Sequence, residues 1–348
     1  MADQPQCGPE PCQDAQLGHD NFNQLHPVLP IRVRCYGETQ SSRHGREISL
    51  RVAFSTCFAA FHAEETFSFP HFFRKTEMDQ REILSTNRQV YDAMAAAEAP
   101  LCRPAKAEEL ANPLATVDAA GWLGDSIRGR NLLCLAAGGG RQSSLYAEAG
   151  ANVTVVDLSG AMLELDRRVA AERGYSLRLF ETSMDQLSML SDGEFDIVIH
   201  PVSTCYLPHI QPVFAEVARV TRPQGIYISQ HKQPTSLQAS LTPDGGNYTL
   251  QHRYYRESPV PAPAPNTANA RRLREPGAVE FLHRWEEIIG GMCRAGFVVE
   301  DLSEPLHAKK DASPGSFADR ASYIAPYVRI KARRRGQLSN DASLWLPR

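Results

Sequence analysis

The sequence predicts an α/β fold in which a mostly parallel sheet carries helices on both faces. Three observations support this prediction. Short apolar segments alternate with segments of helical periodicity over residues 131–232, as in buried parallel strands joined by crossover helices. Three glycines at 138–140 follow the first apolar segment, and the second apolar segment ends on an acidic residue, Asp157. This order is typical of a nucleotide-binding βαβ unit.

The first predicted strand and its turn lie in residues 132–146, LLCLAAGGGRQSSLY. Glycine has no Cβ, so Gly138, Gly139 and Gly140 allow a tight turn and a close approach of a ligand to the backbone. We expect amide donors at the start of the next helix to face that ligand. Asp157 follows Gly138 by 157 − 138 = 19 positions, which suits a carboxylate that accepts hydrogen bonds from ribose hydroxyls.

Further strands and two helices continue the pattern. Strands are predicted at 177–180, 195–199, 225–229, 297–302 and 327–331. One predicted helix has an apolar face formed by Ile210, Val213, Phe214, Val217 and Val220. A second helix is predicted over 278–294, where Phe281, Leu282, Trp285, Ile289 and Met292 share a face.

Residues 233–276 interrupt the α/β rhythm. This insertion contains Tyr248, Tyr254 and Tyr255 and the proline-rich stretch PVPAPAP at 259–265. Aromatic residues here suit a lid over a small planar or apolar substrate. A surface hairpin followed by a polyproline linker is the alternative.

Together these features resemble the class I S-adenosylmethionine-dependent methyltransferases, in particular the small-molecule enzymes with a type 11 methyltransferase domain. The resemblance lies in the glycine-rich turn, VVDLS with a Met three positions on, FDIVI, and EVARVTRPQG before a strand. It implies a Rossmann-like sheet of seven strands, mostly parallel, whose last hairpin is antiparallel. An N-terminal helical cap and an insertion after the fifth strand complete the expected fold.

The resemblance also implies S-adenosyl-L-methionine as the cofactor. The expected contacts come from four segments of the chain: Ala137, Gly138, Gly139, Gly140 and Gln142; Asp157, Leu158 and Met162; Ser183, Met184 and Asp185; and His200. The glycines would pack on the methionine portion, and Asp157 would bind the ribose hydroxyls. Met162 would flank the adenine or fill the core, and Asp185 would recognise the adenine edge or cap a turn.

Two positions depart from the family pattern. The family's first strand usually carries an acidic residue that helps to hold the methionine amino group, and this position is Ala136. The third motif glycine is replaced by Gln142. Arg141, Gln142 or the Ser143 hydroxyl are therefore the candidates to hold the methionine end.

Methyl transfer from a sulfonium is an in-line displacement, so positioning can supply much of the acceleration. A general base helps only when the acceptor must lose a proton. The candidate bases are His200, at the end of the fourth strand, and His231, just past the fifth; a structural role is the alternative for each. Tyr206, Tyr254 and Tyr255 are candidate substrate contacts.

Two other functions fit the same turn. An NAD(P)-dependent oxidoreductase uses it too, but the last position of Gly-x-Gly-x-x-Gly is Ser143 here. A non-catalytic protein that retains the cofactor pocket is the second alternative, because Ala136 departs from the pattern. The identity of the acceptor, its nucleophilic atom and the oligomeric state are not determined by these residues.

Composition bears on partners and location. The 348 residues carry a formal net charge of −3 with a pI of about 6.4, without the basic domain expected of a nucleic-acid-binding protein. No apolar run approaches the ~20 residues that span a bilayer, and the eight cysteines lack metal-ligand spacing. We expect a cytoplasmic enzyme with a small-molecule methyl acceptor, no metal, and no nucleic-acid or membrane partner.

The expected organisation has four parts. Residues 1–77 form a poorly ordered extension, and 78–125 form the N-terminal helical cap. Residues 126–335 form the methyltransferase domain, of which 233–276 is a substrate-side insertion. Residues 336–348 form a C-terminal tail.

Overall fold

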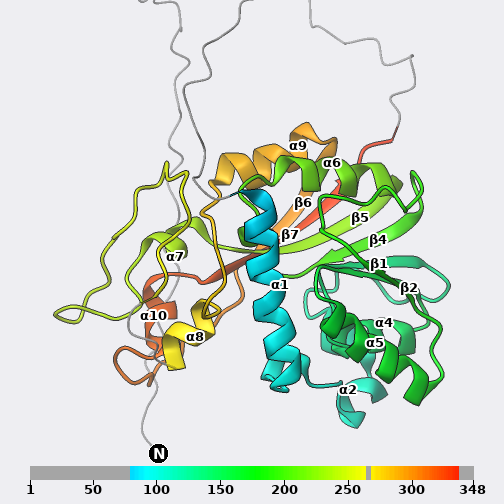
Figure 1. The fold of residues 1–348 in the computed structure, drawn as a ribbon, viewed down its shortest axis with the longest axis horizontal. Coiled ribbons are helices and arrows are strands. Elements are labelled where there is room, and N and C mark those ends of the chain that lie inside the picture. Colours follow the sequence, from blue (N-terminus) through cyan, green and yellow to red (C-terminus); the bar gives the residue numbers. More distant parts are fainter. Residues whose placement is uncertain (1–78, 264–267, 337–348) are drawn as a thin grey trace, which may run out of the picture. The chain divides into compact units, whose positions relative to one another are not determined.

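The computed structural model describes residues 79–263 and 268–336, and these ranges contain a seven-stranded sheet (Figure 1). Its strand order is β3-β2-β1-β4-β5-β7-β6. The strands are β1 (Asn131–Leu135), β2 (Asn152–Asp157), β3 (Arg178–Glu181), β4 (Phe195–His200), β5 (Thr221–Lys232), β6 (Phe297–Ser303) and β7 (Tyr327–Arg334). The first five strands pair in parallel, and β7 is antiparallel to both β5 and β6. The predicted α/β fold with an antiparallel end is confirmed.

Helices cover both faces of this sheet. The α-helices are α1 (Gln80–Ala96), α2 (Ala107–Ala111), α3 (Pro113–Val117), α4 (Arg141–Glu148), α5 (Gly160–Arg173), α6 (Gln211–Val220), α7 (Pro234–Gln238), α8 (Ala268–Leu273), α9 (Gly291–Arg294) and α10 (Phe317–Tyr323). Short turns of other helical types are η1 (Pro100–Cys102), η2 (Thr204–Tyr206) and η3 (Glu286–Gly290). In Figure 1, α6 and α9 lie on one side of the sheet, and α4 and α5 on the other.

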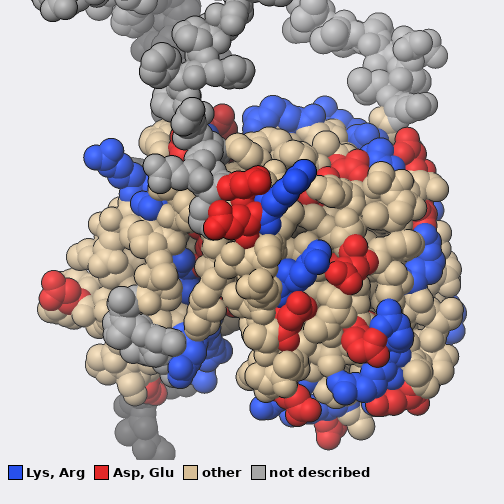
Figure 2. Space-filling model, in the orientation of Figure 1, with Lys and Arg blue, Asp and Glu red and all other residues tan. Residues whose placement is uncertain are grey.

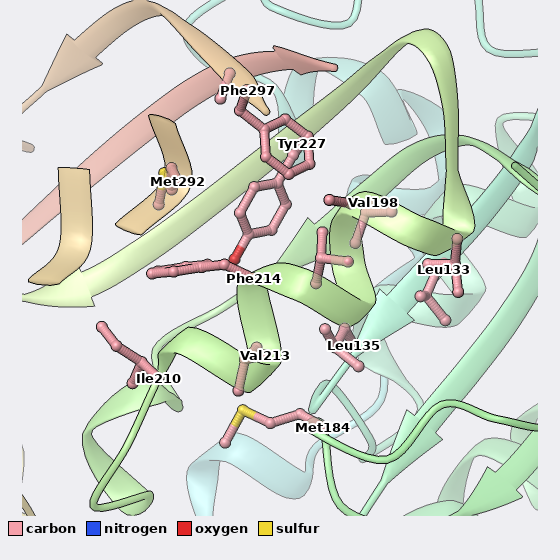
Figure 3. Close-up of a cluster of buried hydrophobic side chains, with 14 of the residues drawn as sticks. Leu133, Leu135, Met184, Val198, Ile210, Val213, Phe214, Tyr227, Met292 and Phe297 are labelled. Atoms are coloured by element: carbon pink, nitrogen blue, oxygen red, sulfur yellow. The ribbon is translucent and has the colours of Figure 1, made fainter. Parts of the chain in front are cut away.

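The two faces follow from the alternation of side chains along each strand. In β1, Leu133 and Leu135 join the core beneath α6, whereas Leu132 and Cys134 join the core beneath α4 and α5. Figure 3 shows the first of these cores. There the ring centroids of Phe214 and Tyr227 lie 6.4 Å apart, and those of Tyr227 and Phe297 lie 5.4 Å apart. Strands β1, β2 and β4 are therefore anchored from both sides.

The predicted helix over 278–294 is wrong in its first half. Residues 278–284 form no helix, and the helical turns begin at Glu286. The backbone of this segment pairs with distant parts of the chain: the amide of Val279 donates to Asn87 Oδ1 at 2.7 Å, and the amide of Phe281 donates to the carbonyl of Cys205 at 2.7 Å. These tertiary hydrogen bonds replace the helical ones that the apolar spacing favoured.

Two of the predicted parts fall wholly or mostly outside the described residues. The predicted extension at 1–77 and the residues 337–348 of the predicted tail lie outside the described ranges. Among the helices that are described, none has the length and apolar character needed to cross a membrane.

Candidate functional site

A cavity of about 550 Å³ lies at the carboxyl ends of β1, β2 and β4, with α1 on its other side. This volume is within the range of small-molecule sites, roughly 300–1,000 Å³. Open parallel sheets bind ligands at this edge because the loops after the strands converge there. The cavity is therefore the candidate functional site.

The structure brings most of the predicted cofactor positions to this cavity. Its wall includes Ala137, Gly138, Gln142, Asp157, Leu158, Met162, Ser183 and Met184. Of the other predicted positions, Gly139 and Gly140 are not among its lining residues, nor are Asp185 and His200. Asp185 instead accepts a hydrogen bond from Gln80 Nε2 at 3.0 Å, which ties the loop after β3 to α1. The ligand roles of these residues stay predictions.

The glycine-rich turn needs small residues for two different reasons. A Cβ on Gly138 would lie 2.9 Å from Met162 Cβ and 3.1 Å from Asp157 Cγ, so a side chain there would clash with the next crossover. Gly139 and Gly140 have φ of +116° and +78°, which L-residues rarely adopt. The turn thus lies against β2 and α5 while it forms the floor of the cavity.

That amides at the start of α4 face a ligand stays a prediction, whereas the amides of the three turn glycines have partners within the protein. Gly138 N donates to Asp157 Oδ2 at 2.9 Å. Gly139 N and Gly140 N donate to the two oxygens of Asp166, at 2.9 and 3.1 Å. These donors are satisfied within the protein, because a buried N–H without a partner is costly.

Asp166 is a residue of the site that the sequence reasoning missed. It lies on the buried face of α5 with Met162 and Val169, at positions spaced by four and three residues. An acid on an apolar helical stripe was the signal that could have identified it. Burial raises its pKa to about 6, although hydrogen bonds from Ser143 and the two glycine amides act in the opposite direction.

Asp157 combines burial with remaining hydrogen-bond capacity. Its oxygens accept from Gly138 N and Ser159 N, both at 2.9 Å. Burial raises its pKa, while these amides lower it. A carboxylate offers about four acceptor sites, so each oxygen can accept one more hydrogen bond. This arrangement fits a vicinal diol.

The three residues expected to hold the methionine end of the cofactor differ in their hydrogen bonds. The Ser143 hydroxyl donates to Asp166, and Arg141 Nη2 donates to Glu109 Oε1 at 2.5 Å. Gln142 Oε1 is buried, and no hydrogen-bond partner for it is found among the described residues. Of the three, Gln142 is therefore the residue that lines the cavity with an acceptor oxygen able to take a hydrogen bond from a ligand.

The structure does not support His200 and His231 as bases at this cavity. His200 Nδ1 bonds Tyr227 Oη at 2.7 Å and Nε2 bonds Ser203 Oγ at 2.6 Å. Burial lowers the pKa of His200 to about 3, so its ring is neutral at pH 7. Both ring nitrogens already have partners inside the protein, which describes a structural histidine.

His231 is corrected for a related reason. It lies within β5 and not beyond it, because β5 continues to Lys232. Strand alternation places it on the same face as Tyr227 and Ser229, where it bonds Thr204 Oγ1 and Ser229 Oγ, both at 2.8 Å. Burial lowers its pKa well below the usual value. Neither predicted base reaches the cavity wall in the described part of the chain.

Only one of the three predicted substrate tyrosines lies at the cavity. Tyr206 lines the cavity, but Tyr254 and Tyr255 are not among its lining residues. Tyr254 packs against Leu237 and Val260 of the insertion and against Leu282, and Tyr255 is 76% exposed. This part of the insertion bonds to the non-helical residues 278–284, as in the hydrogen bond from Val260 N to the carbonyl of Glu280 at 2.7 Å.

Other wall residues were not among the predicted site residues. Leu84, Asn87 and Tyr91 of α1 line the cavity, as does Glu275 after α8. The rings of Tyr91 and Tyr206 meet edge to face, 5.6 Å apart. Polar residues at spacing four in α1, Asn87 and Tyr91, were the available signal. Within the described ranges, no cluster of His, Cys, Asp or Glu suited to a metal ion is found.

Comparison with known proteins agrees with the site's location. Residues 133–229 match the family model described as a methyltransferase domain. An uncharacterized methyltransferase of Bacillus subtilis, YbaJ, is 34% identical over 180 residues, which cover 51% of this chain and 69% of that protein. A ubiquinone biosynthesis O-methyltransferase of Bordetella avium is 28% identical over 131 residues, covering 37% and 54%.

A solved S-adenosylmethionine-dependent methyltransferase from Mesorhizobium loti superposes with a TM-score of 0.49 at 21% identity, over 65% of this chain and all of that one. The family match covers the strands and the glycine-rich turn that build the cavity. The alignment with the Bacillus relative covers 69% of that protein's length. The chain belongs to the class I S-adenosylmethionine-dependent methyltransferases.

Proposed function

We propose that this chain transfers a methyl group from S-adenosyl-L-methionine to a small-molecule acceptor by in-line displacement. One observation carries the proposal. A single cavity is lined both by Gly138 and Asp157, where the cofactor is expected, and by Tyr206 and Glu275. Direct transfer requires both reactants in one space, with the nucleophile aligned behind the methyl carbon.

The residues of the cavity fit the cofactor. When bound, S-adenosylmethionine supplies an electrophilic methyl group on a sulfonium. Asp157 would accept the ribose hydroxyls on its remaining lone pairs, and Gln142 Oε1 would accept from the methionine ammonium. Leu158 and Met162 would flank the adenine, with Ser183 and Met184 at its edge.

The surroundings of the cavity favour a small acceptor. Leu84, Tyr91 and Leu101 line it on the side of α1 and η1, and its volume of about 550 Å³ suits a small acceptor. On the face shown in Figure 2, acidic and basic side chains are interspersed. That face carries no single basic surface of the kind that binds nucleic acid.

The cofactor half of the proposal is tested by calorimetry with S-adenosylhomocysteine and with NAD. We expect binding of the first compound only. A hydrogen bond to a charged group contributes about 1.5–3 kcal/mol, so Asp157→Asn should weaken the affinity about 10- to 100-fold. Asp311→Asn, on an exposed loop, is the matched control and should leave it unchanged. Binding of NAD in place of S-adenosylhomocysteine would restore the oxidoreductase alternative.

The catalytic half requires a separate measurement. The protein is incubated with a metabolite extract and a labelled methyl donor, and labelled products are identified by mass spectrometry. We expect label in one or a few small molecules, lost in Asp157→Asn. Cofactor binding without any labelled product would favour the non-catalytic alternative that Ala136 left open.

A further inference from the structure

We propose that the methyl acceptor is a hydroxyl compound whose O–H donates a hydrogen bond to the carboxylate of Glu275. The inference rests on the proposed function, because it concerns the acceptor end of the same cavity. It would add a catalytic residue to the site and select oxygen as the nucleophilic atom.

Glu275 presents a carboxylate that is already oriented. Its Oε2 accepts a hydrogen bond from Tyr206 Oη at 2.6 Å and another from Lys232 Nζ at 2.8 Å. Both Glu275 and Tyr206 line the cavity, and the side chain of Glu275 is 18% exposed. Because a carboxylate accepts about four hydrogen bonds, capacity remains for a ligand. The two contacts restrict rotation of the group and so define its direction.

A buried ionic cluster keeps this carboxylate charged. Lys232 also contacts Glu280, which in turn contacts Arg274; these three side chains are 3%, 0% and 6% exposed. With Glu275 the cluster holds two positive and two negative groups, so its formal charges balance. Burial raises the pKa of Glu275, but the charge of Lys232 and the hydrogen bonds of Lys232 and Tyr206 outweigh it, and the pKa lies below its usual value. Glu275 is therefore an acceptor at neutral pH.

A fixed carboxylate serves a hydroxyl better than an amine. A hydroxyl that donates its O–H to Glu275 keeps a lone pair on oxygen for attack on the methyl carbon. An amine beside a carboxylate is favoured in its protonated form, in which the lone pair is bound to hydrogen. A thiol is only a weak donor, and a carbon nucleophile has no comparable donor.

The reaction balances with Glu275 as the proton acceptor. The bond between the acceptor oxygen and the methyl carbon forms while the bond between carbon and sulfur breaks, and its electron pair passes to sulfur. The O–H proton moves to Glu275 and from there to water, leaving a methyl ether and a thioether. The oxygen becomes positively charged as the new bond forms. Its proton is then acidic enough for a carboxylate of lowered pKa to accept.

The side chains that line the cavity near Glu275 indicate the chemical class of the acceptor beyond its hydroxyl group. The rings of Tyr91 and Tyr206, in edge-to-face contact at 5.6 Å, stand beside Leu84 and Leu207. Aromatic and aliphatic side chains of this kind pack on planar, apolar groups. A phenol or a related planar hydroxyl compound therefore matches both the walls and the carboxylate.

The test compares three variants in the labelled-methyl assay on a metabolite extract. Glu275→Gln removes the charge of the side chain but keeps its shape. Tyr206→Phe removes one of the hydrogen bonds that Glu275 accepts. Glu286→Gln is the control. The Glu286 side chain is 67% exposed. We expect a product methylated on oxygen, identified by NMR and mass spectrometry. Because general base catalysis contributes about 10²- to 10⁴-fold, Glu275→Gln should lower kcat/KM by at least ~100-fold, and Glu286→Gln should not lower it.

Affinity for S-adenosylhomocysteine separates this inference from the proposed function. It should stay unchanged in Glu275→Gln and Tyr206→Phe, since neither change touches the cofactor end. If the natural chain fails to bind S-adenosylhomocysteine, the proposed function itself is wrong. If it binds, a product methylated on nitrogen, carbon or sulfur overturns only the present inference, as does full activity of Glu275→Gln. Should that variant fail to fold, Tyr206→Phe decides: undiminished turnover contradicts the inference.

Discussion

The carboxylate of Asp166 accepts a hydrogen bond from the backbone amide of Gly139 at 2.9 Å, and this bond joins α5 to the turn after β1. Gly140 N and the Ser143 hydroxyl donate to the same carboxylate. Three donors from one short segment thus converge on one acid of the next crossover helix. The glycine-rich turn is therefore shaped from within the protein, before any ligand is bound.

Replacing Asp166 should disturb both the fold and the cofactor site. In Asp166→Asn, one oxygen remains an acceptor while the amide NH₂ faces a donor, so at least one buried N–H or O–H loses its partner. An unsatisfied buried group costs about 1–3 kcal/mol. We expect the free energy of unfolding, from urea titration, to fall by that amount and the affinity for S-adenosylhomocysteine to fall with it. Asp311→Asn is the control; equal behaviour of the two variants would contradict the role of Asp166.

Asp166 should also shape the pH dependence of stability. Its folded pKa of about 6 lies above the unfolded value of 3.8, so between these values the folded state holds more protons. Its contribution to the free energy of unfolding is then fully present below about pH 4 and is lost as pH rises through 6. The difference is on the order of 2–3 kcal/mol. Urea titrations of the natural chain and Asp166→Asn from pH 4 to 7 measure it, and parallel curves would refute it.

His200 should act on stability with the opposite sign. Its folded pKa of about 3 lies below the usual value of 6.5, so the unfolded chain takes up a proton that the buried ring resists. The stabilisation is present above pH 6.5 and declines as pH falls toward 3. We expect His200→Gln to be less stable at pH 7 by about 1–3 kcal/mol, and to lose less stability on acidification. A selective loss of kcat with unchanged stability would instead return His200 to the role of base.

The exposed tyrosine of the insertion should be dispensable. Tyr255 is 76% exposed, and its ring lies 5.1 Å from the guanidinium carbon of Arg284, away from the cavity-lining residues. Surface substitutions of this kind usually change stability by less than about 0.5 kcal/mol. We expect Tyr255→Ala to keep its melting temperature and its kcat/KM toward the acceptor found in the labelled assay. A large rise in KM would show that the insertion closes over the substrate.

Much of the fold was predictable from local patterns. The apolar runs at 132–135 and 195–199 became β1 and β4 because strands buried on both faces need apolar side chains at nearly every position. Asp157 and Gly138 could be located for a similar reason, since they end one strand and follow another. Parallel strands bring such positions to the same edge of a sheet.

The remaining site depended on which side chains face inward, and this the sequence alone did not reveal. Apolar spacing predicted a helix over 278–294, but residues 278–284 are not helical and bond instead to Asn87 and Cys205. His200 and His231 occupy strand positions where each is only 1% exposed and bonded within the protein, which their place in the sequence did not show. Asp166 and Glu275 reach the site from separate segments, α5 and the turn after α8. Periodicity describes how one element buries its own face, whereas the partners of a buried polar group come from distant segments and are decided only when these pack together.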